Sequence, residues 1–265
     1  MHNTGTRKFL LALGMVLLHT AFGLFVIMSS IWLCLALWFQ QPFGGLVTRL
    51  LIGIWIAFAL SILSIYITQY VLNRQTDVLI YVLFFLVGLS WYFGLQARQD
   101  REWNPEVAQV LSYRQHGDQV TLNNVRNFNW HADGSYDERW ETRHYDLSQI
   151  TGVNVLTSYW MGPQIAHTLV SFDFKNQAPL VFSIEIRKEK NEQFSAIGGF
   201  FRQFDLSLIA ADEHDIVYTR SNVRGEQVYF FPISHLSQQE MQALFLAYLQ
   251  QADALRTRPS WYNTL

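Results

Sequence analysis

Three long apolar stretches dominate the first part of this chain. Between Phe9 and Leu95 the only charged residues are Arg49, Arg74 and Asp77. They separate three apolar stretches, which cover residues 9–39, 50–72 and 78–95. A helix needs about 20 apolar residues to cross the hydrocarbon core of a bilayer, and these stretches are apolar all round instead of on one face. The sequence therefore predicts a membrane anchor with three transmembrane helices.

The first stretch is longer than one span requires, and it follows Arg7 and Lys8. A cleaved signal peptide with residues 9–18 as its apolar core is therefore an alternative. The apolar run continues as far as Trp38, however, as it does in an uncleaved anchor. Because tilting can absorb the extra length, we expect a transmembrane helix here.

Basic residues near the ends of the spans predict the orientation of the chain. Lys and Arg are enriched in short cytoplasmic segments, which places Arg7, Lys8 and Arg74 in the cytoplasm and Arg49 in a short outer loop. Three spans then send the second half to the outer side. In a bacterium this predicts a multi-pass protein of the inner membrane, with the lipid bilayer as its first partner and its C-terminal domain in the periplasm.

Residues 98–265 differ sharply in composition from the anchor, residues 1–97. They contain 15 basic and 20 acidic residues without a block of like charge, so we expect no nucleic-acid partner. This half has no cysteine, and it therefore offers no disulfide. Its length is sufficient for one well-buried core, which predicts a single extracytoplasmic domain.

Local patterns in this half predict an α+β fold with a mostly antiparallel sheet. Apolar runs at residues 107–114 and 119–125 flank a Gly-Asp turn and predict a hairpin. Runs at residues 167–174 and 180–186 predict a second hairpin. Ser237 and Glu240 form a capping-box sequence before apolar residues at helical spacing, which predicts one late helix that packs on the sheet.

Six sequence strings in this half resemble, in order, those of the Lnb N-terminal periplasmic domain family. They lie at residues 123–128, 165–172, 182–189, 199–202, 211–215 and 259–263, and the resemblance extends over residues 101–265. It implies a papain-like thiol enzyme of the permuted type, in which the histidine precedes the cysteine. It also implies acyl transfer or hydrolysis on lipid or lipoprotein substrates of the cell envelope, a lipoprotein or phospholipid being the expected partner.

In the family, the Tyr-Asn string is followed within a few residues by Asn-Cys-Thr-Thr, whose cysteine is the expected nucleophile. The printed sequence ends at Leu265 before such a string, and its only cysteine is Cys34 in the first apolar stretch. We therefore expect a C-terminally incomplete domain or an inactive form. Cys34 at the outer membrane face, or Ser171 or Ser183 in place of cysteine, are alternatives.

The resemblance also implies roles for particular residues. His167 is the candidate general base, because a thiol nucleophile needs an imidazole within hydrogen-bond reach, and Glu185 is the candidate group that orients it. Arg187, Arg126 and Arg202 are candidates for binding a ligand. Alternatives stay open: His167 as a structural histidine, Glu185 and Arg187 in solvated ion pairs, and Arg126 or Arg202 in a buried pair with a carboxylate.

We expect no cofactor and no metal. The run Asp212-Glu213-His214-Asp215 contains metal-ligating residue types, but four adjacent side chains cannot all face one ion, and a charged turn explains them. Whether the chain is an enzyme stays open at this stage. A membrane-anchored scaffold that recognises envelope partners without catalysis is the competing prediction.

Overall fold

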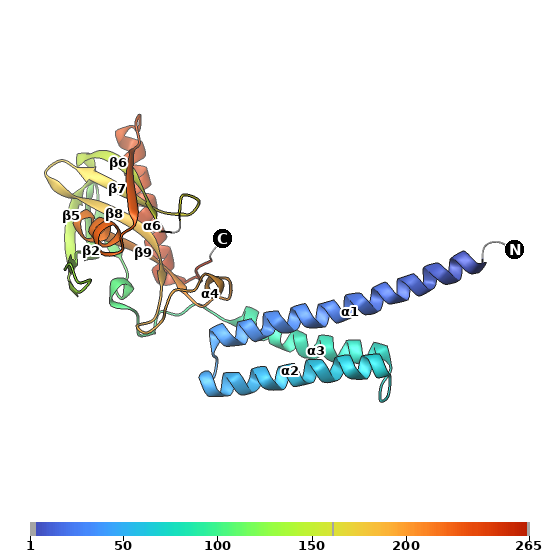
Figure 1. Cartoon of the computed structure of the whole chain (residues 1–265). Helices are drawn as coiled ribbons and strands as arrows, with labels where there is room; N and C mark the ends of the chain where they lie inside the picture. Colours follow the sequence, from blue (N-terminus) through green and yellow to red (C-terminus); the bar gives the residue numbers. More distant parts are fainter. Residues whose placement is uncertain (1–3, 161, 264–265) are drawn as a thin grey trace. The chain divides into compact units, whose positions relative to one another are not determined.

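The computed structural model describes residues 4–160 and 162–263 and divides the chain into two compact units. Figure 1 shows the long helices of one unit and the sheet of the other. The helical unit comprises the described residues up to Leu95 together with Phe200–Gln203. The domain unit comprises Gln96–Gly199 and the described residues from Phe204 onward.

The helical unit consists of three long apolar helices. They are α1 (Thr4–Gln40), α2 (Gly45–Thr68) and α3 (Arg74–Gly94). Each has the length and the apolar composition needed to cross a membrane, which confirms the predicted helices. The second helix begins five residues and ends four residues earlier than its apolar stretch. It ends at Thr68 because Gln69 adopts a left-handed backbone conformation.

Aromatic side chains fill the space between these helices. Tyr81 of α3 is fully buried and lies against Phe22 of α1 and Phe58 of α2. A short segment from later in the chain also belongs to this unit: the Phe201 ring stacks on Phe39, with centroids 5.7 Å apart. The Gln40 side-chain amide donates hydrogen bonds of 2.6 Å to the backbone carbonyl groups of Phe201 and Arg202.

The domain unit is built on an eight-stranded sheet with the strand order β1-β2-β9-β8-β7-β6-β10, in which β5 pairs with β2 beside this path. Its strands are β1 (Ser112–His116), β2 (Gln119–Arg126), β5 (Trp140–Asp146), β6 (Ile150–Tyr159), β7 (Ala166–Phe174), β8 (Gln177–Arg187), β9 (Asp205–Asp212) and β10 (Gln227–Pro232). A separate two-stranded sheet joins β3 (Asn129–Trp130) to β4 (Tyr136–Asp137). All pairs are antiparallel except β2 with β9. The α+β class and both predicted hairpins are confirmed.

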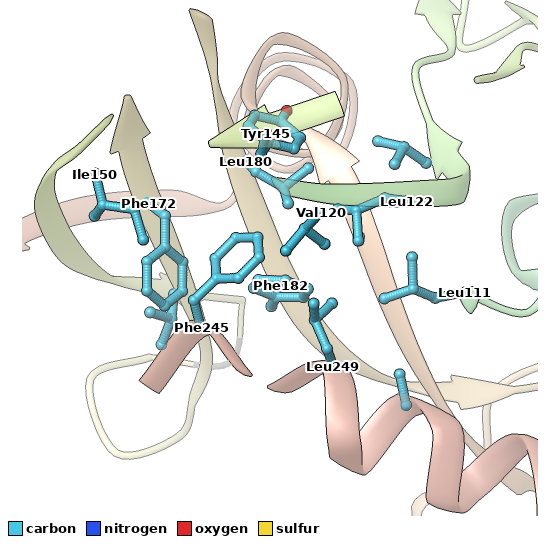
Figure 2. Packing of buried hydrophobic residues seen from close by; sticks show 14 of the residues in the cluster. Leu111, Val120, Leu122, Tyr145, Ile150, Phe172, Leu180, Phe182, Phe245 and Leu249 are labelled. Atoms are coloured by element: carbon cyan, nitrogen blue, oxygen red, sulfur yellow. The ribbon is translucent and has the colours of Figure 1, made fainter. Parts of the chain in front are cut away.

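Helix α6 (Gln238–Thr257) covers one face of the sheet. Both hydrogen bonds of the predicted capping box form between Ser237 and Glu240. Phe245 and Leu249 of this helix are fully buried against Phe172 and Phe182 of the sheet, as Figure 2 shows. This face holds the larger of the two apolar cores of the domain unit.

The opposite face of the sheet carries a smaller core and then a polar region. Helix α5 (Glu213–Tyr218) continues into a π-helical turn, η3 (Thr219–Val223). Ile216 of α5 packs against Leu169 and Val181, which lie on β7 and β8. Since side chains alternate along a strand, residues two or four positions away from Leu169 and Val181 on these strands point to the same side. They lie beyond the apolar core and form the site described next.

Candidate functional site

A pocket of about 380 Å³ lies on the α5 face of the sheet. Its walls include His167 of β7, Glu185 of β8, Arg220 of η3, Glu226 and Tyr262. A pocket of this volume is of the size that small-molecule sites commonly have. The structure therefore brings the candidate base and the candidate orienting group into one concave site.

Strand register explains why these two side chains meet. Leu169 of β7 pairs with Ser183 of β8 in antiparallel register. His167 precedes Leu169 by two residues and Glu185 follows Ser183 by two, so all four side chains point to the same face. Ser158 of β6 pairs with His167 and adds a third strand to the site.

Ser183 lies between the imidazole and the carboxylate. The Nε2 atom of His167 is 2.7 Å from the Ser183 hydroxyl oxygen, and that hydroxyl donates a hydrogen bond of 2.6 Å to Glu185 Oε1. The direct distance from His167 Nε2 to Glu185 Oε1 is 3.5 Å. Ser183 is 1% exposed, whereas the His167 side chain is 20% exposed. The imidazole is thus accessible from the pocket, and its Nε2 atom is held by the buried Ser183 hydroxyl.

Arg220 fixes the charge state of the carboxylate. One guanidinium nitrogen lies 2.6 Å from Glu185 Oε1, and another lies 3.2 Å from Glu226 Oε2. Burial raises the pKa of Glu185, but the charges of Arg220 and His167 outweigh it, and the pKa lies well below the ordinary value. Ser158 donates a further hydrogen bond to Glu226. Glu185 is therefore an anion at neutral pH.

Arg126 lines the same pocket, but its guanidinium is engaged in a buried ion pair. Its Nε and Nη2 atoms donate to Asp215 at 2.9 and 3.1 Å. Asp215 also accepts from the backbone amide of Phe128 and from Trp130 Nε1. This arrangement agrees with the alternative of a buried pair, and a role in ligand binding stays a prediction.

The other two candidate arginines do not line this pocket. Arg187 donates to the carbonyl groups of Val107 and Ala108 and lies 4.3 Å above the Trp103 ring. Burial lowers its pKa to about 10. Arg202 belongs to the helical unit, where it donates to the Tyr92 carbonyl oxygen. No contact in the described chain joins either residue to His167, and their proposed ligand-binding roles stay predictions.

The C-terminal segment reaches the pocket through Tyr262. Its backbone amide donates to the carbonyl of Phe204, and the Leu206 amide donates to Ser260. Burial raises the pKa of the Tyr262 hydroxyl. Thr264 and Leu265 lie outside the described residues. Cys34, the single cysteine of the printed sequence, lies on α1 in the helical unit.

The acidic run at residues 212–215 divides between two structural roles. Asp212 caps α5 by accepting from the backbone amide of His214, and Asp215 turns inward to Arg126. Across residues 4–160 and 162–263, no three His, Cys, Asp or Glu side chains are grouped so that they could hold a metal ion.

Sequence reasoning missed Arg220, Glu226 and Ser158. Arg220 lies on η3, far in sequence from Glu185, and no motif surrounds it. A π-helical turn is a frequent feature of functional sites, but its residue pattern is too short to recognise in one sequence. Only the folded chain reveals this part of the site.

Comparison with known proteins gives a family match for the C-terminal part of the chain. The family model described as the Lnb N-terminal periplasmic domain matches residues 136–265. This range includes His167, Glu185, Arg220 and Glu226, whereas Arg126 lies before it. No curated protein sequence and no solved structure matches the chain.

Proposed function

The chain carries an Lnb N-terminal periplasmic domain together with three apolar helices. We propose that it functions in the bacterial inner membrane. The periplasmic domain performs thiol-dependent acyl transfer or hydrolysis on lipid or lipoprotein substrates of the cell envelope. Its fold is of the permuted papain-like type. His167 is the general base and Glu185 the group that orients it.

One observation carries this proposal. His167, Ser183, Glu185 and Arg220 form a connected polar array on the wall of a pocket. Thiol chemistry needs an imidazole held in place beside the sulfur, and an ion-paired carboxylate behind the imidazole supports that role. The reaction requires a cysteine at the pocket. The Tyr262 segment lines the pocket and is the expected route to it.

The membrane anchor supports the choice of substrate class. Confinement to a bilayer raises the effective concentration of substrates that share the same bilayer. The pocket wall also includes the apolar side chains of Ile184 and Phe194, which are 46% and 51% exposed. An apolar wall beside a polar array suits a substrate with an acyl chain and a polar reacting group.

The test uses the protein as its host encodes it, reconstituted in phospholipid vesicles with a radiolabelled acyl chain. We expect transfer of label to an added lipopeptide, or its release as fatty acid. Replacement of a general base costs roughly 100- to 10,000-fold in rate, so His167→Ala is expected to lose activity by that factor. His116→Ala, at the exposed last residue of β1, is the matched control. Absence of product from the unsubstituted protein contradicts the proposal.

A second candidate function is a non-catalytic binding module of the cell envelope. It is favoured by one observation: His167, Glu185 and Arg220 line the pocket with charged and polar groups that can hold a ligand without any thiol. In this case the pocket binds an envelope ligand without turnover. Photocrosslinking of the labelled lipid at the pocket, with no product formed by either the unsubstituted protein or His167→Ala, would favour this function.

A further inference from the structure

Ser183 separates the two groups that the proposed function pairs directly. We propose that Ser183 and Arg220 are positioning residues: Arg220 holds Glu185 as an ion pair, the Ser183 hydroxyl donates to Glu185, and His167 Nε2–H donates to Ser183. This relay leaves Nδ1 of His167 as the nitrogen that accepts a proton. Its catalytic consequence rests on the proposed function, whereas the relay itself is testable without any activity.

The direction of the relay begins at Glu185. Arg220 contacts Glu185 at 2.6 Å, and the side chains of these two residues are only 5% and 18% exposed. An ionised carboxylate accepts hydrogen bonds but cannot donate one. Every neighbour within hydrogen-bond distance of Glu185 Oε1 must therefore present a hydrogen to it.

Ser183 has a single hydroxyl hydrogen to place. Its oxygen is 2.6 Å from Glu185 Oε1 and 2.7 Å from His167 Nε2. Since Glu185 can only accept, the hydroxyl hydrogen points to Glu185. The lone pairs of the same oxygen then face His167. Because Ser183 is 1% exposed, solvent does not offer a competing arrangement.

The tautomer of His167 follows from this inventory. A neutral imidazole carries one hydrogen, on either Nδ1 or Nε2, and the group that each nitrogen meets decides which. Nε2 meets an acceptor oxygen, so Nε2 carries the hydrogen. Nδ1 holds the lone pair. When Nδ1 takes a proton from a thiol, the sulfur becomes a thiolate and the ring an imidazolium, which the Glu185 charge stabilises at 3.5 Å.

A second ion pair, with Glu226, fixes the position of Arg220. Its other guanidinium nitrogen contacts Glu226, whose side chain is 8% exposed and also accepts from Ser158. The planar guanidinium thereby spans two acceptors in a fixed geometry, which a lysine ammonium cannot reproduce. Arg220 thus acts on His167 only through Glu185 and Ser183, and touches neither the imidazole nor a reacting atom.

The experiment measures the tautomer of His167 directly. Full-length protein labelled with ¹⁵N-histidine is placed in lipid nanodiscs, and His167 is identified by the signal lost in His167→Gln. At a pH where the ring is neutral, the two ring nitrogens of His167 are expected to show the widely separated shifts of a fixed Nε2–H tautomer. Exposed His116 is expected to show the averaged shifts of a mixture.

Two substitutions at Ser183 provide the matched pair. Ser183→Ala removes the bridging oxygen and is expected to move the His167 shifts toward the averaged values, while Ser183→Thr retains the hydroxyl and keeps them fixed. Unchanged His116 and His144 signals verify that both variants are folded. A fixed Nδ1–H tautomer in the unsubstituted protein, an averaged mixture there, or a Ser183→Ala spectrum identical to it would overturn the relay.

Measurements of kcat and KM provide a separate test of the positioning role. If the proposed acyl chemistry occurs, misplacing the imidazole is expected to lower kcat about 100-fold in Ser183→Ala with little change in KM. Arg220→Lys is expected to lower kcat in the same way, because the ammonium cannot span both carboxylates. Absence of activity in all forms rejects the proposed function and leaves the tautomer result standing. Activity with an unaltered kcat in Ser183→Ala rejects the positioning role.

Discussion

Two buried carboxylates, one in each unit of this chain, have opposite surroundings. In the domain unit, Asp215 is fully buried and accepts hydrogen bonds from Arg126, the Phe128 amide and the Trp130 indole. In the helical unit, Asp77 is also fully buried, but neither of its oxygens has a hydrogen-bond partner within the described chain. A buried polar group without a partner is costly, so the two units tolerate different kinds of substitution.

The difference arises from the donors that each architecture leaves available. In the helical unit the backbone amides bond along their own helices, and aromatic rings occupy the space between them. The Tyr81 hydroxyl, one turn after Asp77, is already engaged with Ser29, Ser30 and the Val26 carbonyl. In the domain unit, the Arg126 side chain at the end of β2, the Phe128 backbone amide and the Trp130 indole supply donors to Asp215.

The largest expected effect is at Asp215. Asp215→Asn keeps the shape but leaves the Arg126 charge buried and unpaired. Breaking a buried pair in this way costs about 3–5 kcal/mol, and the free energy of unfolding of the domain unit should fall by that amount. Urea unfolding of the full chain in detergent, followed by near-ultraviolet circular dichroism, measures it.

The control for this comparison is an exposed ion pair in the same unit. Asp253 pairs with Arg256, and their side chains are 46% and 48% exposed. Such pairs contribute about 0.5 kcal/mol or less, so Asp253→Asn should barely change the unfolding midpoint. Equal effects of the two substitutions would show that burial of the Arg126 pair has no special energetic role.

Signals that act over short sequence distances predicted most of the fold. The apolar stretches specify helices because the backbone groups of a membrane span must form hydrogen bonds within their own segment. The turn at Gly117 and the Ser237 capping box mark ends of elements by local chemistry. Partners distant in sequence were not predictable: Arg126 and Asp215 are 89 residues apart, and nothing in either string specifies the other.

The site was predicted only in part for the same reason. His167 and Glu185 were selected through family resemblance, and strand register then explains their proximity. Ser183 was considered as a replacement nucleophile, whereas the structure places it between these two side chains. Arg220 carries no local signal, since its position depends on how η3 packs over β8. Residues that hold other residues in place need tertiary contacts to be recognised.

The second largest effect concerns Asp205 at the start of β9. Asp205 is 2% exposed, and burial raises its pKa to about 6 although Arg101 opposes this shift. A carboxyl group with a raised folded pKa favours folding when protonated. This contribution is complete below the unfolded pKa of about 3.9 and is lost as the pH rises through about 6.

Asp205→Asn should therefore stabilise the domain unit at pH 7.5 by up to about 3 kcal/mol, with the gain shrinking toward zero near pH 4. Urea unfolding at both pH values measures the difference. Asp253→Asn should show no such pH dependence. A loss of stability at pH 7.5 would mean that the Asp205 carboxylate has a favourable partner, and that the domain unit pairs all of its buried acids.

A smaller effect is expected in the helical unit. Asp77→Leu replaces an unpartnered polar group by an apolar one, and relief of an unsatisfied buried group is worth about 1–3 kcal/mol. The helical unit should then resist unfolding by sodium dodecyl sulfate at a higher mole fraction of detergent. Ser61→Leu, at an exposed position on α2, should change little. A destabilised Asp77→Leu protein would contradict the contrast between the units.

The smallest expected effect concerns the first turn of α6. Helix α6 starts with reciprocal bonds: Ser237 Oγ accepts from the Glu240 amide at 3.3 Å, and the Glu240 carboxylate accepts from the Ser237 amide at 2.8 Å. In the helical unit, Gly44 precedes α2 without a side-chain cap, whereas the Asn73 side chain caps α3. Ser237→Ala should destabilise the domain unit by about 1 kcal/mol in urea unfolding. Gln239→Ala, in the same exposed first turn, should leave stability unchanged. An equal loss of stability in both variants would show that the Ser237 cap does not stabilise α6.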